Sequence, residues 1–275
     1  MKRLSILFAL FPLLGCDYHD DFKQKQANSN KSQLENQVNI SGKTQPQTIK
    51  SKNDAMLEDK QNTNSDKSKS IVASARKSHV LLNVPLVKQN PELKYGCEVT
   101  SLSMVLKYAG VKTDKMELYR RVKKDPDQLV RAKNGDILRW GNPAEGFVGD
   151  MTGRQAGYAV FDQPIVNLVN EFLPKRAVNL TNRSFDEVLD HVSKGYPAVV
   201  WTTGDYRLPD RWEGWIHGNQ YIKTPLDLHA VVLVGYDPTS VYLNDPLSGR
   251  KQVRVSKSRF ISSWKALKSR AVSYH

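Results

Sequence analysis

The stretch that decides the fold spans residues 228–245 and reads Leu-His-Ala-Val-Val-Leu-Val-Gly-Tyr-Asp-Pro-Thr-Ser-Val-Tyr-Leu-Asn-Asp. Its two runs of Val, Leu and Tyr predict strands over 230–236 and 241–244. The Asp-Pro-Thr-Ser sequence between them favours a turn, so the two strands should form an antiparallel hairpin. Counting back from that turn places Asp245 opposite His229 to within about two residues.

The rest of the sequence predicts helices ahead of this hairpin and further strands around it. Apolar residues at helical spacing predict helices over residues 97–109, 114–124, 164–173, 184–194 and 260–267. Short runs of β-branched and aromatic residues predict strands over residues 80–87, 198–202, 253–255 and 271–274. Residues 125–157 and 204–228 are interpreted as long loops. Helices first and antiparallel strands later predict an α+β fold.

A candidate nucleophile, Cys97, begins the helix predicted over 97–109. A glycine precedes it, and the first turn of a helix favours an anion, so we expect a thiolate with a pKa well below that of a free thiol. His229 starts a strand, where its ring can face that helix end and pair with the thiolate. Asp245 can accept the second imidazole N–H and fix the orientation of the ring. Gln89 can stabilise a developing oxyanion together with the backbone N–H of Cys97.

Each of these four residues also has an ordinary structural interpretation. A lone buried cysteine usually behaves as a small hydrophobic residue, and His229 alone could be a core histidine. Asp245 precedes a proline and could simply end a strand, while Gln89 could belong to a loop. The presence of all four in one chain favours a catalytic site.

Other polar and aromatic residues give weaker signals. No spacing of His and Cys fits a metal site and no glycine-rich phosphate loop is found, so no metal and no cofactor are expected. The tryptophans at 201, 212 and 215 flank the predicted loop before His229, where they either line a cleft or pack beneath the loop. The remaining histidines are interpreted as ordinary residues, at positions 19, 79, 191, 217 and 275.

The N-terminus predicts export and lipid attachment. A short basic region is followed by an apolar run over 4–14, which has the length of a signal peptide and is too short to cross a bilayer. The run ends in Leu-Leu-Gly-Cys16, which resembles the lipobox of bacterial lipoproteins. That resemblance implies cleavage before Cys16, with acylation of its sulfur and of the new N-terminus. An ordinary secretory leader with an incidental cysteine is the alternative.

Composition divides the chain into a signal peptide over 1–15, a tether over 16–77 and one domain over 78–275. The tether is rich in Asn, Gln, Ser and Lys with few aromatic residues, which predicts disorder. The 41 Lys and Arg residues exceed the 28 Asp and Glu residues, giving a formal net charge of +13 that suits association with anionic lipids or wall polymers. We expect a monomer, anchored in the cell membrane by lipid and facing the outside of the cytoplasm, with no nucleic-acid partner.

The motifs resemble those of a known family. The similarity is to stand-alone relatives of the bacteriocin-leader-processing peptidases, which belong to the papain-like superfamily of cysteine peptidases. The matching segments are Gln89, Gly96-Cys-Glu-Val-Thr-Ser-Leu102, His229-Ala-Val-Val-Leu-Val-Gly-Tyr-Asp237, Asn244-Asp-Pro246, Phe161-Asp-Gln-Pro-Ile165 and Lys194-Gly-Tyr-Pro-Ala-Val-Val-Trp201. The resemblance covers nearly all of residues 79–275 and implies N-terminal helices packed on an antiparallel β-sheet.

The same resemblance implies an activity. Cys97 would be the nucleophile, His229 the general base and acid, Asp245 the orienting acid and Gln89 part of the oxyanion hole, in a peptidase that cleaves peptide or protein substrates through a thioester. The best-known members precede an exporter's ATP-binding and membrane domains and cut after a double glycine. This sequence contains no such domains, so that substrate is not carried over. Two alternatives remain open: an inactive module that binds peptides or wall fragments, and an acyl transferase.

Overall fold

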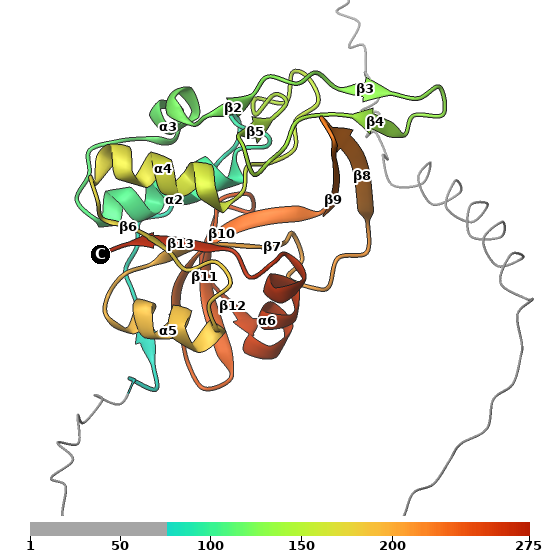
Figure 1. Ribbon diagram of the computed structural model, residues 1–275. Coiled ribbons are helices and arrows are strands. Elements are labelled where there is room, and N and C mark those ends of the chain that lie inside the picture. Colours follow the sequence, from blue (N-terminus) through green and yellow to red (C-terminus); the bar gives the residue numbers. More distant parts are fainter. Residues whose placement is uncertain (1–75) are drawn as a thin grey trace, which may run out of the picture. The chain divides into compact units, whose positions relative to one another are not determined.

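The computed structural model describes residues 76–275 (Figure 1). The predicted signal peptide, Cys16 and nearly all of the predicted tether lie outside these residues. No helix within 76–275 is long and apolar enough to cross a membrane.

A seven-stranded sheet forms the centre of the described part, with the strand order β12-β11-β10-β7-β13-β6 and β1 paired with β10. All of these pairs are antiparallel. The strands are β1 Val80–Leu81, β6 Ala177–Asn179, β7 Ala198–Thr203, β10 Leu228–Tyr236, β11 Ser240–Asp245, β12 Arg250–Ser256 and β13 Ala271–Tyr274. The structure therefore contains the predicted hairpin, as β10 and β11, and the fold mixes helices with an antiparallel sheet.

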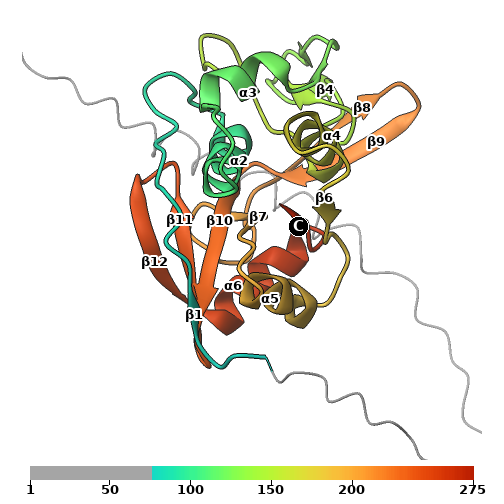
Figure 2. The same ribbon diagram turned by 90° about the vertical axis from the view of Figure 1, so that its left-hand side faces the viewer.

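Helices lie against both faces of this sheet (Figures 1 and 2). The helices are α2 Cys97–Tyr108, α3 Lys115–Arg121, α4 Asp162–Phe172, α5 Phe185–Ser193 and α6 Lys257–Ala266. Buried side chains of α2 and α4 pack with Val199 and Val232, whereas those of α5 and α6 pack with Val200 and Val231. Successive strand residues point to opposite faces, so β7 and β10 are buried along nearly their whole length. The prediction placed the N-terminal helices on the sheet. It did not include the opposite face of the sheet, which α5 and α6 cover.

The two regions predicted as loops contain strands, so that prediction was wrong. Two short strands, β2 Lys124–Asp125 and β5 Phe147–Val148, form a parallel pair. A four-stranded sheet combines β3 Val130–Arg131, β4 Ile137–Arg139, β8 Trp212–His217 and β9 Gln220–Pro225. A Gly-Asn turn at 218–219 joins β8 to β9, and Gly218 has a φ of +53°, which such hairpin turns favour. The turn was a signal in the sequence that the loop interpretation overlooked.

Candidate active site

Cys97 is the first residue of α2, with Gly96 at the N-cap. A β-carbon at position 96 would lie 2.5 Å from the side chain of Leu93, which explains the need for glycine there. The helix is attached to β10 by a buried hydrogen bond, in which the Ser101 hydroxyl donates to the carbonyl of Ala230 at 3.1 Å. Because Ala230 directly follows His229, this bond holds the first turns of α2 against the part of β10 that carries the histidine.

His229 and Asp245 form a buried pair. Nε2 of His229 lies 2.9 Å from Oδ1 of Asp245, and the two residues are 3% and 4% exposed. Asn244 pairs with Val232, so Asp245 falls across from Val231, two residues from His229. Residues 229 and 231 point to the same face of the strand, which lets the ring reach the carboxylate. The expected hydrogen bond between the two side chains is thus present.

Asp245 is surrounded by hydrogen-bond donors. Besides the His229 ring, it accepts bonds from the backbone N–H groups of Leu247 and Ser248, the Ser248 hydroxyl and the Tyr206 hydroxyl. Burial alone would raise the pKa of Asp245, but the bond and charge of His229, with the bonds from Ser248 and Leu247, hold that pKa well below its usual range. An ionised Asp245 requires Nε2 to be the donor, which leaves Nδ1 of a neutral ring as an acceptor.

The Cys97 thiol does not have the predicted low pKa. Burial raises this pKa well above that of a free thiol, and the charge of Glu98 raises it further, while backbone hydrogen bonds from Ala230 and Cys97 lower it by less. Its sulfur donates to Oε2 of Glu98 at 3.3 Å. Among the side chains of residues 76–275, no hydrogen bond joins this thiol to the His229 ring. The prediction considered the helix dipole and overlooked burial beside a carboxyl group.

Glu98 is a site residue that the sequence interpretation missed. The residue is fully buried, and its Oε1 accepts a hydrogen bond from the backbone N–H of Val160 at 3.0 Å. Burial raises the pKa of Glu98 to about 7, although the hydrogen bonds from Val160, its own backbone N–H and Cys97 oppose that shift. The available signal was a charged residue directly after the nucleophile, inside a helix that is otherwise uncharged and buried at this end.

Gln89 lies in the loop that leads to Cys97. Its backbone N–H donates to the carbonyl of Pro246 at 3.0 Å, which fixes this loop beside Asp245. The side-chain Nε2 donates to the carbonyl of Lys94 at 2.9 Å, and Oε1 is buried with no hydrogen-bond partner within residues 76–275. One amide hydrogen remains for a further acceptor. The role of Gln89 in an oxyanion hole stays a prediction.

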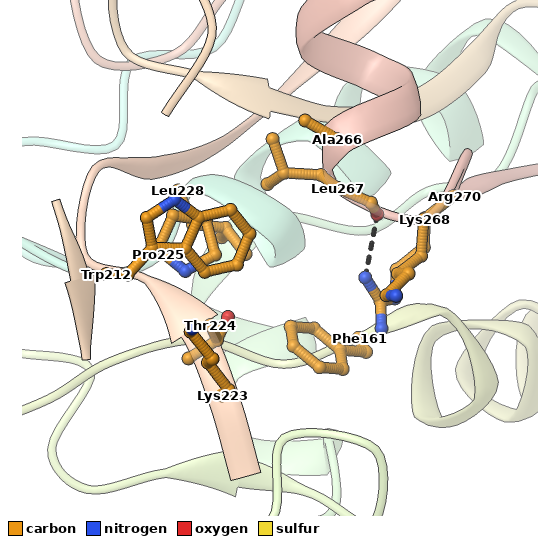
Figure 3. A pocket seen from close by; sticks show the side chains of 10 residues that line it. All are labelled: Phe161, Trp212, Lys223, Thr224, Pro225, Leu228, Ala266, Leu267, Lys268 and Arg270. Atoms are coloured by element: carbon orange, nitrogen blue, oxygen red, sulfur yellow. Dashed lines mark hydrogen bonds between the residues drawn. The ribbon is translucent and has the colours of Figure 1, made fainter. Parts of the chain in front are cut away.

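A small pocket lies next to the site (Figure 3). Leu228, which precedes His229, lines it together with the half-exposed Trp212 of β8, whereas Trp201 and Trp215 are fully buried. Arg270 on the opposite wall donates to the Leu267 carbonyl at 2.7 Å, the dashed line in Figure 3. Trp212 therefore lines a pocket, and Trp201 and Trp215 pack in the interior.

A group of possible metal ligands lies in a different part of the described chain. Ligand atoms of Asp125, Glu145 and His217 lie within 4.8 Å of one another, so His217 has acidic neighbours that its isolated position in the sequence did not reveal. Two of these side chains already accept hydrogen bonds from Asn142, at Oδ2 of Asp125 and Oε1 of Glu145.

Comparison with known proteins assigns the family. The model of the Peptidase C39 like family matches residues 81–272, a range that includes Gln89, Cys97, His229 and Asp245. The chain belongs to this family. It is 36% identical over 182 residues to the uncharacterized protein YvpB of Bacillus subtilis (strain 168), covering 66% of this chain and 70% of that protein. A crystal structure described as a C39-like peptidase from Bacillus anthracis shares 39% identity at a TM-score of 0.65, covering 72% of this chain and 98% of that one.

Family membership confirms the resemblance at the level of C39-like peptidases. The lipid anchor stays a prediction, as do the catalytic roles of the individual residues.

Proposed function

We propose that this protein is a cysteine peptidase of papain-like fold that hydrolyses peptide bonds outside the cytoplasm. The observation that carries the proposal is the buried pair of His229 and Asp245 beside the start of α2, where Cys97 lies. The hydrogen bond from Ser101 to Ala230 supports a fixed position of the cysteine relative to the histidine. Family membership supports the same reaction class.

The contacts suggest the order of proton transfers. Asp245 accepts Nε2–H, so Nδ1 of His229 is free to take the thiol proton once Cys97 turns away from Glu98. The thiolate attacks the carbonyl carbon of the scissile bond, and the backbone N–H of Cys97 and the spare amide hydrogen of Gln89 stabilise the oxyanion. His229 then protonates the leaving amine, which leaves a thioester. Water attacks the thioester with His229 as base, releasing the acid and restoring the thiol.

We further propose that the domain is held at the membrane by lipid on Cys16, as a monomer. The support is the Leu-Leu-Gly-Cys16 sequence after a run of signal-peptide length. Mass spectrometry of the N-terminal peptide should show acylated Cys16, and Cys16→Ser should release the protein or leave its leader uncleaved. A wild-type protein without an acyl group would contradict the anchor.

A digest of a peptide library with the purified full chain tests the peptidase. Cleavage is expected for the wild type and for Cys16→Ser, the control for the other cysteine, and should be lost in Cys97→Ala. Cleavage that survives Cys97→Ala would exclude this nucleophile. Peptide binding without cleavage by the wild type would favour the inactive binding module, and transfer to an added amine would favour the acyl transferase.

A further inference from the structure

The residue after the nucleophile places a carboxyl group in the core. Glu98 is fully buried, with Oε2 at 3.3 Å from the Cys97 sulfur and Oε1 at 3.0 Å from the N–H of Val160. Val160 is fixed in turn, because the indole N–H of Trp201 donates to its carbonyl at 3.0 Å. The carboxyl group therefore has a defined orientation, with one oxygen left to contact the thiol.

No cation compensates Glu98: within residues 76–275 it forms no ion pair. Of the elements packed on α2, β7 presents the uncharged Trp201, and β10 presents the backbone N–H of Ala230, the residue after His229, to the thiol. The segment before α4 brings the phenol of Tyr158, whose pKa is raised by burial and in part by the charge of Glu98. Most charged side chains of α3 and α4 pair elsewhere, in ion pairs that include Lys115–Glu92, Arg121–Glu171 and Arg270–Asp162.

This arrangement makes the two protonation states of Glu98 differ in their effect on Cys97. An ionised carboxylate can only accept, so it holds the S–H and opposes a second negative charge on the sulfur. A neutral carboxyl group can donate its O–H to a thiolate. Because the pKa of Glu98 is raised to about 7, both states are accessible near neutral pH.

We propose that Glu98 is a positioning residue that holds the Cys97 thiol protonated and turned away from His229, and that loss of its negative charge frees the sulfur to become a thiolate. The inference rests on the proposed role of Cys97 as nucleophile. The proton of the S–H passes to Nδ1 of His229 when the sulfur turns, and no other group is oxidised or reduced.

Substitution of Glu98 by glutamine separates this role from a purely structural one. The amide oxygen of Gln can still accept from Val160, while the amide nitrogen donates to the sulfur and the negative charge is lost. We expect the pH midpoint of iodoacetamide labelling of Cys97 to fall by about one unit or more, so labelling at pH 7 becomes roughly tenfold faster. Full chains carrying Cys16→Ser would be compared, so that Cys97 is their single cysteine. Glu171→Gln is the matched control, because it removes a surface carboxylate at the end of α4.

Two outcomes would overturn the proposal. One is a folded Glu98→Gln protein, judged by its thermal unfolding, whose labelling midpoint equals that of the wild type. The other needs no variant: a wild-type midpoint at or below the roughly 8.5 of a free thiol would show that the thiol is not held protonated. Labelling involves no substrate, so a shifted midpoint without peptide cleavage would refute the peptidase alone. Cleavage that depends on Cys97 with an unshifted midpoint would refute the role of Glu98 alone.

Discussion

Two buried carboxyl groups on either side of the site, Asp245 and Glu98, have opposite tendencies to ionise. Asp245 ends β11 and accepts hydrogen bonds from a ring nitrogen, two backbone N–H groups and two hydroxyls. Glu98, in the first turn of α2, accepts from the N–H of Val160 and from a thiol. Both are buried, but only Asp245 has enough donors to offset the loss of water, so its pKa falls while that of Glu98 rises.

The comparison shows that burial does not fix the charge of a carboxyl group, because the donors around it decide which form is stable. An ionised Asp245 suits a group that orients an imidazole throughout the reaction. A Glu98 that titrates near neutral pH suits a group whose contact with the nucleophile must change. Pairs of carboxyl groups with diverging pKa values are a recurrent feature of active sites.

The largest effect is expected for His229, the partner of Asp245. His229→Ala removes the base that accepts the thiol proton, so turnover of a cleavable peptide should fall by about 10³-fold or more. Adding Asp245→Ala to this variant should cause little further loss, because the aspartate acts through the histidine. Steady-state kinetics of the two single variants and the double variant test this non-additivity. Independent, multiplying losses would contradict the pairing of His229 with Asp245.

A smaller loss is expected when Asp245 itself is changed. Asp245→Ala should lower turnover by about 10²-fold, less than Cys97→Ala does, because it removes orientation and not a reacting group. Asp245→Asn should retain more activity than Ala. Its amide oxygen can accept from His229 and the backbone N–H groups, while its nitrogen can donate to the Ser248 and Tyr206 hydroxyls. Equal kcat values for the Asn and Ala variants would show that the negative charge matters more than the geometry.

Much of this geometry could be predicted from the sequence because it depends on local patterns. The turn at 237–240 predicted the hairpin, and a register shift between Leu233 and Gly235 then brings Asp245 across from Val231, two residues from His229. Helical spacing located the start of α2 at Cys97. In α5, Ser184 and Glu187 form a capping box, which the Ser-Phe-Asp-Glu sequence favours. Each of these features is set by residues that are close in the sequence or joined by one short turn.

What could not be predicted depends on contacts between distant segments. Glu98 looks in the sequence like an acidic residue that stabilises a helix start, and only its contact with Val160, 62 residues away, shows that it is buried. The prediction of a low pKa for Cys97 was wrong for the same reason, since burial by packing leaves no local signal in the sequence. The strands β3 and β4 have two and three residues, too few for a periodic pattern.

The third prediction concerns stability and compares wild type with Glu98→Gln. The pKa of Glu98 is raised from its ordinary value of 4.5 to about 7, so between these values the folded chain binds more protons than the unfolded chain. Folding stability from this group is therefore fully present below pH 4.5 and lost as the pH rises through 7. Glutamine does not titrate, so the free energy of unfolding of the variant should rise relative to that of the wild type between pH 5 and pH 8, by at most about 3 kcal/mol.

Urea unfolding of both proteins at pH 5, 6, 7 and 8 measures this difference. The Glu171→Gln control should follow the wild type, because its carboxylate is exposed to solvent. If the free energy of unfolding depends on pH in the same way for wild type and Glu98→Gln, Glu98 keeps an ordinary pKa in the folded chain. The contrast between the pKa shifts of Glu98 and Asp245 would then disappear.

The smallest effect is expected where α2 is attached to β10. Ser101→Ala removes the bond to the Ala230 carbonyl and should cost about 1 kcal/mol of folding stability. Turnover should fall by less than about tenfold, because a helix start that moves by a fraction of an ångström still brings Cys97 near His229. Ser103→Ala is the matched control, since that buried hydroxyl donates to Thr100 within the same helix. If Ser103→Ala lowers turnover as much as Ser101→Ala, the loss reflects general loosening of α2, and the bond to β10 has no special part in bringing the thiol to the histidine.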